Sequence, residues 1–364
     1  MRPVFCAQGC ALQVDFEEGR TSVRPYGQTK YIMASINVFL TIDTEHSIGG
    51  AFADPDLKPV GNVRRIFGRI GGKEYGIPLQ MEIADRFGVK LVFFVEVFNR
   101  HFFGADETRR VVETILRRGH DVQLHLHPNY LNFTLARPQD LSYSDLCGDY
   151  PPERQIEMLA EARQLLVDCG APQPTAFRAG CFGANGDTLK ALAGNGLLID
   201  SSYNQAYLGG PCRLPDWGLN DLAEREGVFE LPVTNFVEQT GLRSRRHMPL
   251  DINGVSFEEM RQVLDAARSG VGPRNVTVIL HSFSFIKTYD VQYRRVRPRW
   301  EVIRRFEKLC RFLAENAGNF SVRTLGALTR DDLTGMLSDR SDIFPTMPAR
   351  LSLARFGGQL LDRL

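Results

Sequence analysis

The chain has 364 residues, of which 43% are hydrophobic and 24% are charged, as is ordinary for a globular protein. The formal net charge of +1 excludes a global field that would draw the protein to nucleic acid or to a membrane surface. Seven cysteines without regular spacing disfavour a disulfide framework and are typical of a reducing compartment.

Neither end of the chain has a clear pattern. Residues 1–32 form a poorly defined N-terminal segment, and residues 331–364 form a C-terminal tail that mixes polar residues with short apolar pieces. No stretch has the ~20 apolar residues that a membrane span needs. The stretch from Val4 to Val14 is interrupted by Gln8 and lacks the clean apolar run of a signal peptide. We therefore expect a cytoplasmic protein without a membrane span, whose main domain is residues 33–330.

Between these ends, β-rich apolar runs alternate with helical patterns. Strands are expected at Ile36–Asp43, Lys90–Glu96, Asp121–Leu126, Thr175–Arg178, Leu197–Asp200, Val228–Val233, Val276–His281 and Phe320–Thr324. Helices are expected at Ile77–Phe87, Thr108–Arg118, Pro152–Cys169, Asp187–Ala193, Phe257–Ala267 and Trp300–Glu315. This alternation predicts an α/β fold with a parallel sheet and helices outside it. Seven or eight such units favour a closed (β/α) barrel over an open doubly wound sheet.

Polar side chains stand at the C-terminal ends of five expected strands. They are Asp43 and Glu45 after the first strand, His125 and His127 after the third, Arg178 after the fourth, Asp200 after the fifth and His281 after the seventh. In a parallel β/α barrel these strand ends form one face, and that face carries the active site. The sequence therefore predicts that all seven side chains converge on one mouth.

The spacing within two of these groups indicates a metal site. Asp43 and Glu45 are two residues apart, and so are His125 and His127. Side chains two apart on an extended segment point the same way, so each pair can aim at one point. Two imidazoles and a carboxylate suit a catalytic divalent ion that keeps one position open for water.

Some of these residues also have a purely structural alternative. Arg178 could be an ion-pair partner, and Asp200 could close the turn at Ser201 and Ser202. Two arginine-rich stretches, Arg243–Arg246 and Arg294–Arg305, are either solvated faces or a means of capturing an anionic substrate.

Four other residues are weaker candidates. Glu96 ends the second strand and could act from behind the site, and His46 follows the first strand on a loop. His247 stands beside arginines and could touch a substrate. His120 precedes the third strand and is expected at the opposite end of the barrel.

Five motifs together resemble those of the NodB-homology polysaccharide deacetylases, which are carbohydrate esterase family four, in the glycoside hydrolase/deacetylase superfamily. The motifs are LTIDTE at Leu40–Glu45, GHDVQLHLHP at Gly119–Pro128, FRAG at Phe177–Gly180, LLIDSS at Leu197–Ser202 and VILH at Val278–His281. The similarity runs from about Ile36 to Leu325 and marks the chain as a divergent member. The resemblance implies a distorted (β/α) barrel of about seven parallel strands. It also implies a divalent metal cofactor, with Zn²⁺ as the expected ion.

The resemblance also implies a role for each candidate. Asp43 matches the catalytic base, and Arg178 matches the arginine that holds it. Glu45, His125 and His127 are the implied metal ligands. His281 matches the general acid, and Asp200 matches the carboxylate that tunes this histidine.

Three departures from the family pattern concern the metal and the substrate groove. Thr44 separates two carboxylates that are adjacent in most members. Asn129 stands where a second histidine is usual, so that His127 must supply this ligand. Gly180-Cys181 replaces a Pro-Tyr pair. These departures leave a metal hydrolase in place but disfavour a long polymeric substrate.

The expected function is removal of an acetyl group from an N- or O-acetylated saccharide or glycoconjugate, as a hydrolase of non-peptide carbon–nitrogen bonds. Hydrolysis of a cyclic amide and non-catalytic binding of carbohydrate remain as alternatives. A non-haem iron oxygenase shares the ligand types but not the β/α rhythm. A glycosidase would place Asp43 and Glu45 poorly for flanking a glycosidic bond.

Overall fold

A computed structural model describes residues 35–239, 245–353 and 355. The expectation for residues 1–32 lies outside these ranges.

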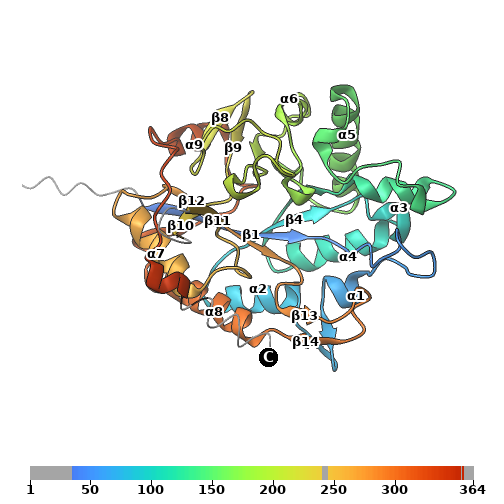
Figure 1. Cartoon of the computed structure of the whole chain (residues 1–364), viewed down its shortest axis with the longest axis horizontal. Coiled ribbons are helices and arrows are strands. Elements are labelled where there is room, and N and C mark those ends of the chain that lie inside the picture. Colours follow the sequence, from blue (N-terminus) through green and yellow to red (C-terminus); the bar gives the residue numbers. More distant parts are fainter. Residues whose placement is uncertain (1–34, 240–244, 354, 356–364) are drawn as a thin grey trace, which may run out of the picture. The chain divides into compact units, whose positions relative to one another are not determined.

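Seven parallel strands form the centre of the fold (Figure 1). In spatial order they are β12 (Asn275–His281), β1 (Ile36–Thr44), β4 (Val92–Glu96), β5 (Asp121–Leu126), β6 (Ala176–Ala179), β7 (Ile199–Asp200) and β9 (Val228–Glu230). At one edge β8 (Ala223–Arg225) pairs antiparallel with β9, and β15 (Phe320–Val322) pairs with the start of β1. The predicted α/β class with about seven parallel strands is confirmed.

The sheet curls, and irregular chain closes the gap between β9 and β12. We call residues 231–234 and 250–252, which fill this gap, the seam. The Leu231 N–H donates to Asp200 O at 2.7 Å on the β7 side, and further backbone bonds join the seam to β12. The result is a distorted barrel, because one part of its wall has no regular strand ladder.

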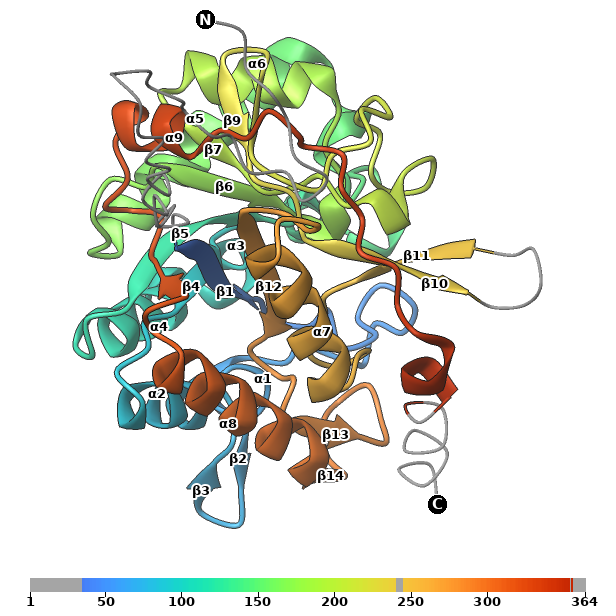
Figure 2. The same cartoon turned by 90° about the vertical axis from the view of Figure 1, so that its left-hand side faces the viewer.

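Helices flank the curved sheet (Figures 1 and 2). The α-helices are α1 (Asn62–Arg65), α2 (Ile77–Arg86), α3 (Arg100–Phe103), α4 (Ala105–Leu116), α5 (Pro152–Asp168), α6 (Gly186–Gly194), α7 (Phe257–Arg268), α8 (Trp300–Glu315) and α9 (Arg330–Met336). Short 3₁₀ turns are η1 (Pro128–Thr134), η2 (Pro138–Asp140), η3 (Cys147–Asp149), η4 (Gly180–Phe182) and η5 (Gln205–Tyr207). None of the described helices is long and apolar enough to span a membrane.

Alternate residues of β1 face two different cores. Val38, Leu40 and Ile42 pack in the larger core, which the helices share, whereas Phe39 packs in a smaller core inside the barrel. Asp43 is four residues after Phe39, so the period of two directs it to the inside as well. The same alternation decides which polar residues of the other strands reach the mouth.

The opposite end of the barrel is covered by α9. Its residues Leu333 and Met336 share the inner core with Phe39 and Val92, which lie in the first halves of their strands. After α9 the chain crosses back to the other side, and the Met347 N–H donates to Val237 O at 2.8 Å. The described part of the C-terminal tail is therefore packed on the barrel.

Three hairpins were not expected from the sequence. They are β2–β3 (Arg69–Ile70 and Lys73–Glu74), β10–β11 (Asn235–Gln239 and Arg245–Pro249) and β13–β14 (Ile286–Thr288 and Val296–Pro298). Each is short and antiparallel. They extend the loops that connect strands and helices, and β10–β11 projects from the seam (Figure 2).

Candidate active site

The strand register aligns polar side chains at the C-terminal end of the barrel interior. Asp43 pairs with His281 on the neighbouring β12. His125 pairs with Glu96 on one side and with Arg178 on the other. Residues that face each other across parallel strands project from the same face of the sheet, so all five side chains point inward.

A pocket of about 280 Å³ opens at this end. Its lining residues are Asp43, Glu45, His125, His127, Cys181, Phe182, Asn204, Tyr207, Pro211, Pro249, Asp251, Ile279 and His281. Five of the seven residues predicted from the sequence therefore meet in one cavity. Arg178 lies directly behind it, and Asp200 is elsewhere.

Glu45, His125 and His127 bring their ligand atoms within 4.8 Å of one another. Glu45 Oε2 lies 2.7 Å from His127 Nε2 and 3.5 Å from His125 Nε2. One carboxylate oxygen thus faces two imidazole nitrogens, and these three atoms form a cluster of potential metal ligands.

The tautomer of His125 is fixed by its backbone contact. His125 Nδ1 lies 2.7 Å from Arg178 O, and a carbonyl oxygen can only accept, so Nδ1 carries the proton. Nε2 therefore presents its lone pair. This atom is buried and has no hydrogen-bond partner, which suits a metal ligand better than a core histidine.

His127 lies between two carboxylates. Its Nδ1 donates to Asp145 Oδ1 at 2.9 Å, while Nε2 faces Glu45. Burial lowers the pKa of His127, but Asp145 and Glu45 outweigh it and hold this pKa well above its usual value. Burial likewise raises the pKa of Glu45, yet His127, His125 and Arg65 bring it well below the usual range.

Arg65 holds the other oxygen of Glu45. Its Nη2 donates to Glu45 Oε1 at 2.9 Å, and its Nε donates to Glu45 O at 3.3 Å. The guanidinium lies 3.2 Å from the centre of the Phe283 ring and bonds Tyr293 Oη. Burial lowers the pKa of Arg65 to about 10, which leaves it charged at neutral pH. Glu45 Oε1 is thereby occupied, while Oε2 is shared with His127 Nε2, whose proton a bound metal ion would displace.

These residues fit a divalent metal ion. The donor set is one carboxylate and two imidazoles, and each imidazole gives its second N–H to an oxygen, one from a carbonyl and one from a carboxylate. Such second contacts fix metal-ligating histidines in many proteins. Nitrogen and oxygen donors in this number suit Zn²⁺ with a position left for water.

Asp43 and Arg178 form a buried ion pair behind the pocket floor. Arg178 Nη1 lies 2.6 Å from Asp43 Oδ1, and the two side chains are 0% and 6% exposed. Arg178 also donates through Nε to Ser201 O and through Nη2 to Ser201 Oγ. Its guanidinium carbon lies 4.4 Å from the centre of the Phe94 ring. Each nitrogen of the guanidinium has a hydrogen-bond partner, which holds Arg178 and orients Asp43.

His281 reaches the pocket from the end of β12. Its backbone N–H donates to Ser284 Oγ at 2.8 Å, and its carbonyl accepts from Gln80 Nε2 at 2.9 Å. The ring lies 5.0 Å from that of Phe283. The backbone of His281 is therefore fixed, while its imidazole lines the cavity.

Asp200 does not reach the site, which corrects the expected contact with His281. Asp200 pairs with Phe177 across the strands β6 and β7, and the ring of Phe177 lies in the larger core that the helices share. The side chain of Asp200 therefore points to the helix side of the sheet. There it accepts from Ser202 Oγ at 2.7 Å. Burial raises the pKa of Asp200, and burial together with the charge of Asp200 holds the pKa of Glu230 well above its usual range. The two acids face each other on the neighbouring strands β7 and β9, outside the pocket lining.

The turn after β6 is built tightly around His127. A Cβ on Gly180 would lie 2.5 Å from His127 Nδ1, so only glycine fits there. The next two residues, Cys181 and Phe182, have φ of 52° and 60°. Two successive non-glycine residues in this region indicate stored strain, which is characteristic of functional sites.

Sequence reasoning missed Asp145, Arg65, Asn204 and Asp251. Asp145 is 18 residues after its partner His127, and Arg65 is 20 residues after Glu45, both on irregular or short segments. No spacing rule connects such positions.

The four weaker candidates have structural surroundings. Glu96 accepts from the N–H groups of Phe98 and Asn99, and burial raises its pKa to about 7. His46 lies between the side chains of Asn62 and Asn99. The other two are also outside the pocket. His120 Nδ1 accepts from Leu91 N near the strand starts, and His247 packs on Phe344.

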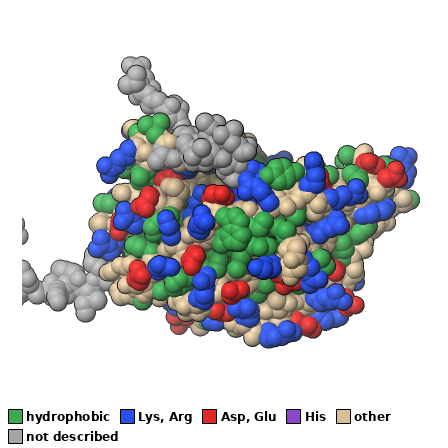
Figure 3. Space-filling model, turned by 90° about the horizontal axis from the view of Figure 1, so that it is seen from below, with side chains coloured by type: hydrophobic (Ala, Val, Ile, Leu, Met, Phe, Trp, Pro, Cys, Tyr) green, Lys and Arg blue, Asp and Glu red, His purple; other side chains and the backbone are tan. Residues whose placement is uncertain are grey.

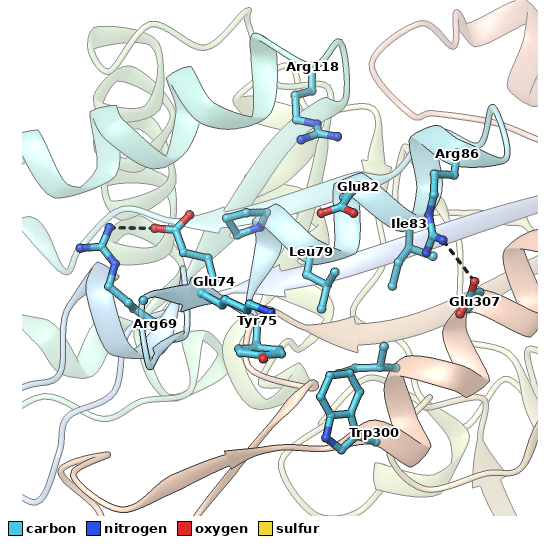
Figure 4. A pocket seen from close by; sticks show the side chains of 14 residues that line it. Arg69, Glu74, Tyr75, Leu79, Glu82, Ile83, Arg86, Arg118, Trp300 and Glu307 are labelled. Carbon is cyan, nitrogen blue, oxygen red and sulfur yellow. Dashed lines mark hydrogen bonds and ion pairs between the residues drawn. The ribbon is translucent and has the colours of Figure 1, made fainter.

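A larger groove of about 780 Å³ lies on the outside, between β2–β3, α2 and α8 (Figure 4). Trp300 and Tyr75 form its aromatic part, edge to face at 5.8 Å. Figure 3 shows an apolar patch ringed by charged side chains on the face seen from below. Two of the carboxylates in the groove, Glu74 and Glu307, are paired with arginines, and the groove has no cluster of metal ligands among the described residues.

Comparisons with known proteins gave structural likenesses alone. No family model matches the chain, and no curated protein matches it. A Mycobacterium smegmatis protein described as a polysaccharide deacetylase is 20% identical, with a TM-score of 0.44 over 80% of this chain and 94% of its own. A family 4 carbohydrate esterase from Streptomyces lividans is 12% identical, with a TM-score of 0.36 over 79% and 91%.

A third solved structure is a 4-alpha-glucanotransferase from Thermococcus litoralis. It is 12% identical, with a TM-score of 0.48 over 91% of this chain and 47% of its own. At these identities the likeness concerns the fold alone.

Proposed function

We propose that this protein is a metal-dependent hydrolase that removes an acetyl group from an N- or O-acetylated carbohydrate. The observation that carries the proposal is the single cavity that holds a ligand set, Glu45, His125 and His127, together with Asp43 and His281. A binding protein has no need of a buried carboxylate and an imidazole beside a metal site.

The bound ion would polarise the acyl carbonyl and make water acidic near neutral pH. Asp43 accepts a proton from the attacking water, because its second oxygen is not used by Arg178 and the residue lines the pocket. Arg178 keeps this carboxylate in place and balances its charge. The new bond joins the water oxygen to the acyl carbon.

His281 supplies the proton for the departing group. As the bond from the acyl carbon to nitrogen or oxygen breaks, the imidazole donates to the leaving atom, so that acetate and an amine or alcohol result. The backbone N–H of Cys181 is the donor that we assign to the developing oxyanion, since the strained turn holds it beside His127. Asp251 lines the same pocket as His281. We assign to Asp251 the role of the carboxylate near this histidine.

The test joins metal content to acetate release. Purified wild type is compared with a His125→Ala/His127→Ala variant and with His247→Ala, a histidine outside the pocket. We expect about one transition-metal ion in the wild type and in the control, none in the double variant, and acetate release from N-acetylated sugars only where metal is bound. Wild type that binds no ion, even when zinc is offered, would contradict the proposal.

A further inference from the structure

We infer that the pocket binds one glycosyl unit at an end of its substrate and excludes acetylated units inside a polymer. This inference rests on the proposed function, because it names the substrate class of the same site. Three independent features of the pocket carry it: its small volume, an aromatic pair at its wall and a buried amide nitrogen without a hydrogen-bond partner.

The pocket is small and is built from many elements. Its lining residues come from the ends of β1, β5, β11 and β12, from the turn after β6, from the chain around η5 and from the seam. An internal unit of a polymer needs two exits, one for each neighbour. The volume of about 280 Å³ is at the small end of ligand sites, which run from ~300 to ~1,000 Å³. It suits a single ring.

Phe182 and Tyr207 form an aromatic wall. Their ring centres are 5.1 Å apart with planes tilted by 47°. Tyr207 is 40% exposed, whereas Phe182 is brought to the cavity by the left-handed turn at Cys181 and Phe182. Strain of this kind persists where a side chain must be held in place. Aromatic faces pack well against the apolar face of a sugar ring.

Asn204 offers a hydrogen-bond donor to a ligand. Its Oδ1 accepts from Ala206 N at 3.3 Å and from Asn235 Nδ2 at 3.1 Å. A backbone N–H can only donate, so this contact fixes which end of the amide is the oxygen. The amide nitrogen is buried without a hydrogen-bond partner, and Asn204 lines the pocket. Burying an unpaired donor is unfavourable, and a sugar hydroxyl or acetyl oxygen would satisfy it.

The far wall adds apolar surface. Pro211, Pro249 and Ile279 line the side that belongs to the chain after η5, the end of β11 and β12. Such a wall has nothing to offer the hydroxyl groups of a second sugar ring. Recognition is therefore concentrated on one ring and its acetyl group, with the rest of a glycoconjugate outside the pocket.

The first experiment compares substrates that differ only in where the acetyl group is. We would use N-acetylglucosamine, β-linked glucosamine trisaccharides acetylated only at one end or the other, and the trisaccharide acetylated only at the middle unit. We expect at least one terminally acetylated trisaccharide to be hydrolysed with a kcat/KM at least ~100-fold above that of the middle-acetylated one. Equal or faster hydrolysis of the middle-acetylated trisaccharide overturns the inference.

The second experiment uses binding alone, so it does not depend on turnover. Saturation-transfer NMR of N-acetylglucosamine with metal-free protein reports contact with the ring protons. Asn204→Ala and Tyr207→Ala are expected to weaken binding by ~10-fold or more, the worth of one good contact. Tyr289→Ala removes another exposed tyrosine, which lies outside the pocket, and serves as the control. Thermal unfolding of each variant checks that the fold is retained.

The two experiments separate the inference from the proposed function. If no compound is hydrolysed but the sugar binds and the pocket variants lose it, the hydrolase proposal fails and the one-unit pocket stands. A sugar-free acetamide is included in the first experiment; if it is hydrolysed while no sugar binds, the metal-dependent hydrolase chemistry stands, and both the carbohydrate substrate and the inference are overturned. Absence of both hydrolysis and binding contradicts both.

Discussion

Asp145 Oδ1 lies 2.9 Å from His127 Nδ1, on the side of the imidazole opposite Glu45. This contact orients the ring and fixes its proton. Burial raises the pKa of Asp145, but the charge of His127 outweighs burial and brings this pKa below its usual value. Asp145→Ala is expected to lower zinc affinity by ~10–100-fold, as loss of such a contact does elsewhere. Competition with a chromophoric chelator measures it.

The control for this prediction is Asp140→Ala. Asp140 is exposed on η2, five residues away, and has no contact with the site. Zinc affinity that stays unchanged in Asp145→Ala would show that His127 is held by something else.

Gly180→Ala is expected to disturb the metal site without unfolding the protein. The added Cβ would lie 2.5 Å from His127 Nδ1, so the imidazole must shift. Metal content and acetate release should both fall strongly. Gly186→Ala is the matched control, because a Cβ there meets nothing within 4 Å. Full metal binding in Gly180→Ala would mean that His127 is not a ligand.

His281→Ala should separate chemistry from metal binding. His281 lines the pocket but is not among the three clustered ligands. We expect unchanged metal content and a kcat lower by ~10²–10⁴-fold, the usual contribution of general acid–base catalysis. Wild-type turnover in this variant removes His281 from the mechanism.

The pair Asp43–Arg178 should matter for stability as well as for turnover. Removing one partner leaves the other buried and unpaired, which costs about 3–5 kcal/mol. Arg178→Met is therefore expected to lower the free energy of unfolding by that amount, and Asp43→Asn/Arg178→Met to recover part of it. Urea unfolding of the metal-free proteins gives the comparison. Independent, additive losses would argue against coupling between the two residues.

The buried acids Asp200 and Glu230 predict how stability depends on pH. Burial raises the pKa of both, and Asp200 adds to the rise at Glu230. The folded state therefore holds protons that the unfolded state releases above its ordinary values of ~4. This contribution is fully present below about pH 4 and is lost as the pH rises through the raised values.

Glu230→Gln should flatten this decline. Glutamine keeps the acceptor for Tyr203 N and offers a donor to Asp200, with no charge to bury. Wild type is expected to lose stability from pH 5 to pH 8 in denaturant unfolding, and the variant to lose less. Glu153→Gln on the exposed start of α5 is the control. Parallel curves for wild type and Glu230→Gln would contradict the prediction.

The sequence predicted the barrel well because buried parallel strands are continuous apolar runs. Residues 36–43 and 121–126 were expected almost as they are observed, as β1 and β5. The hairpins were missed because they are too short to show a period. The same limit explains Asp200: in a strand of two residues, periodicity cannot tell which residue faces inward.

For the pocket, the sequence predicted the residues on long strands and missed those that arrive on loops. Asp43 and His125 follow strands whose alternation is visible in the sequence. Asp145 and Asn204 belong to chain without regular structure. Their positions depend on how the loops pack against each other, and local sequence patterns do not predict this packing.

The seam has a consequence for how such a protein can change. Because residues 231–234 and 250–252 close the barrel without a regular ladder, the chain between them, including β10–β11, can gain or lose residues without altering strand register. Pro249 and Asp251, which line the pocket, lie where this segment rejoins the barrel. Exchanging this one segment for another would give new substrate preferences on an unchanged metal site, which makes it the natural place for grafting in enzyme engineering.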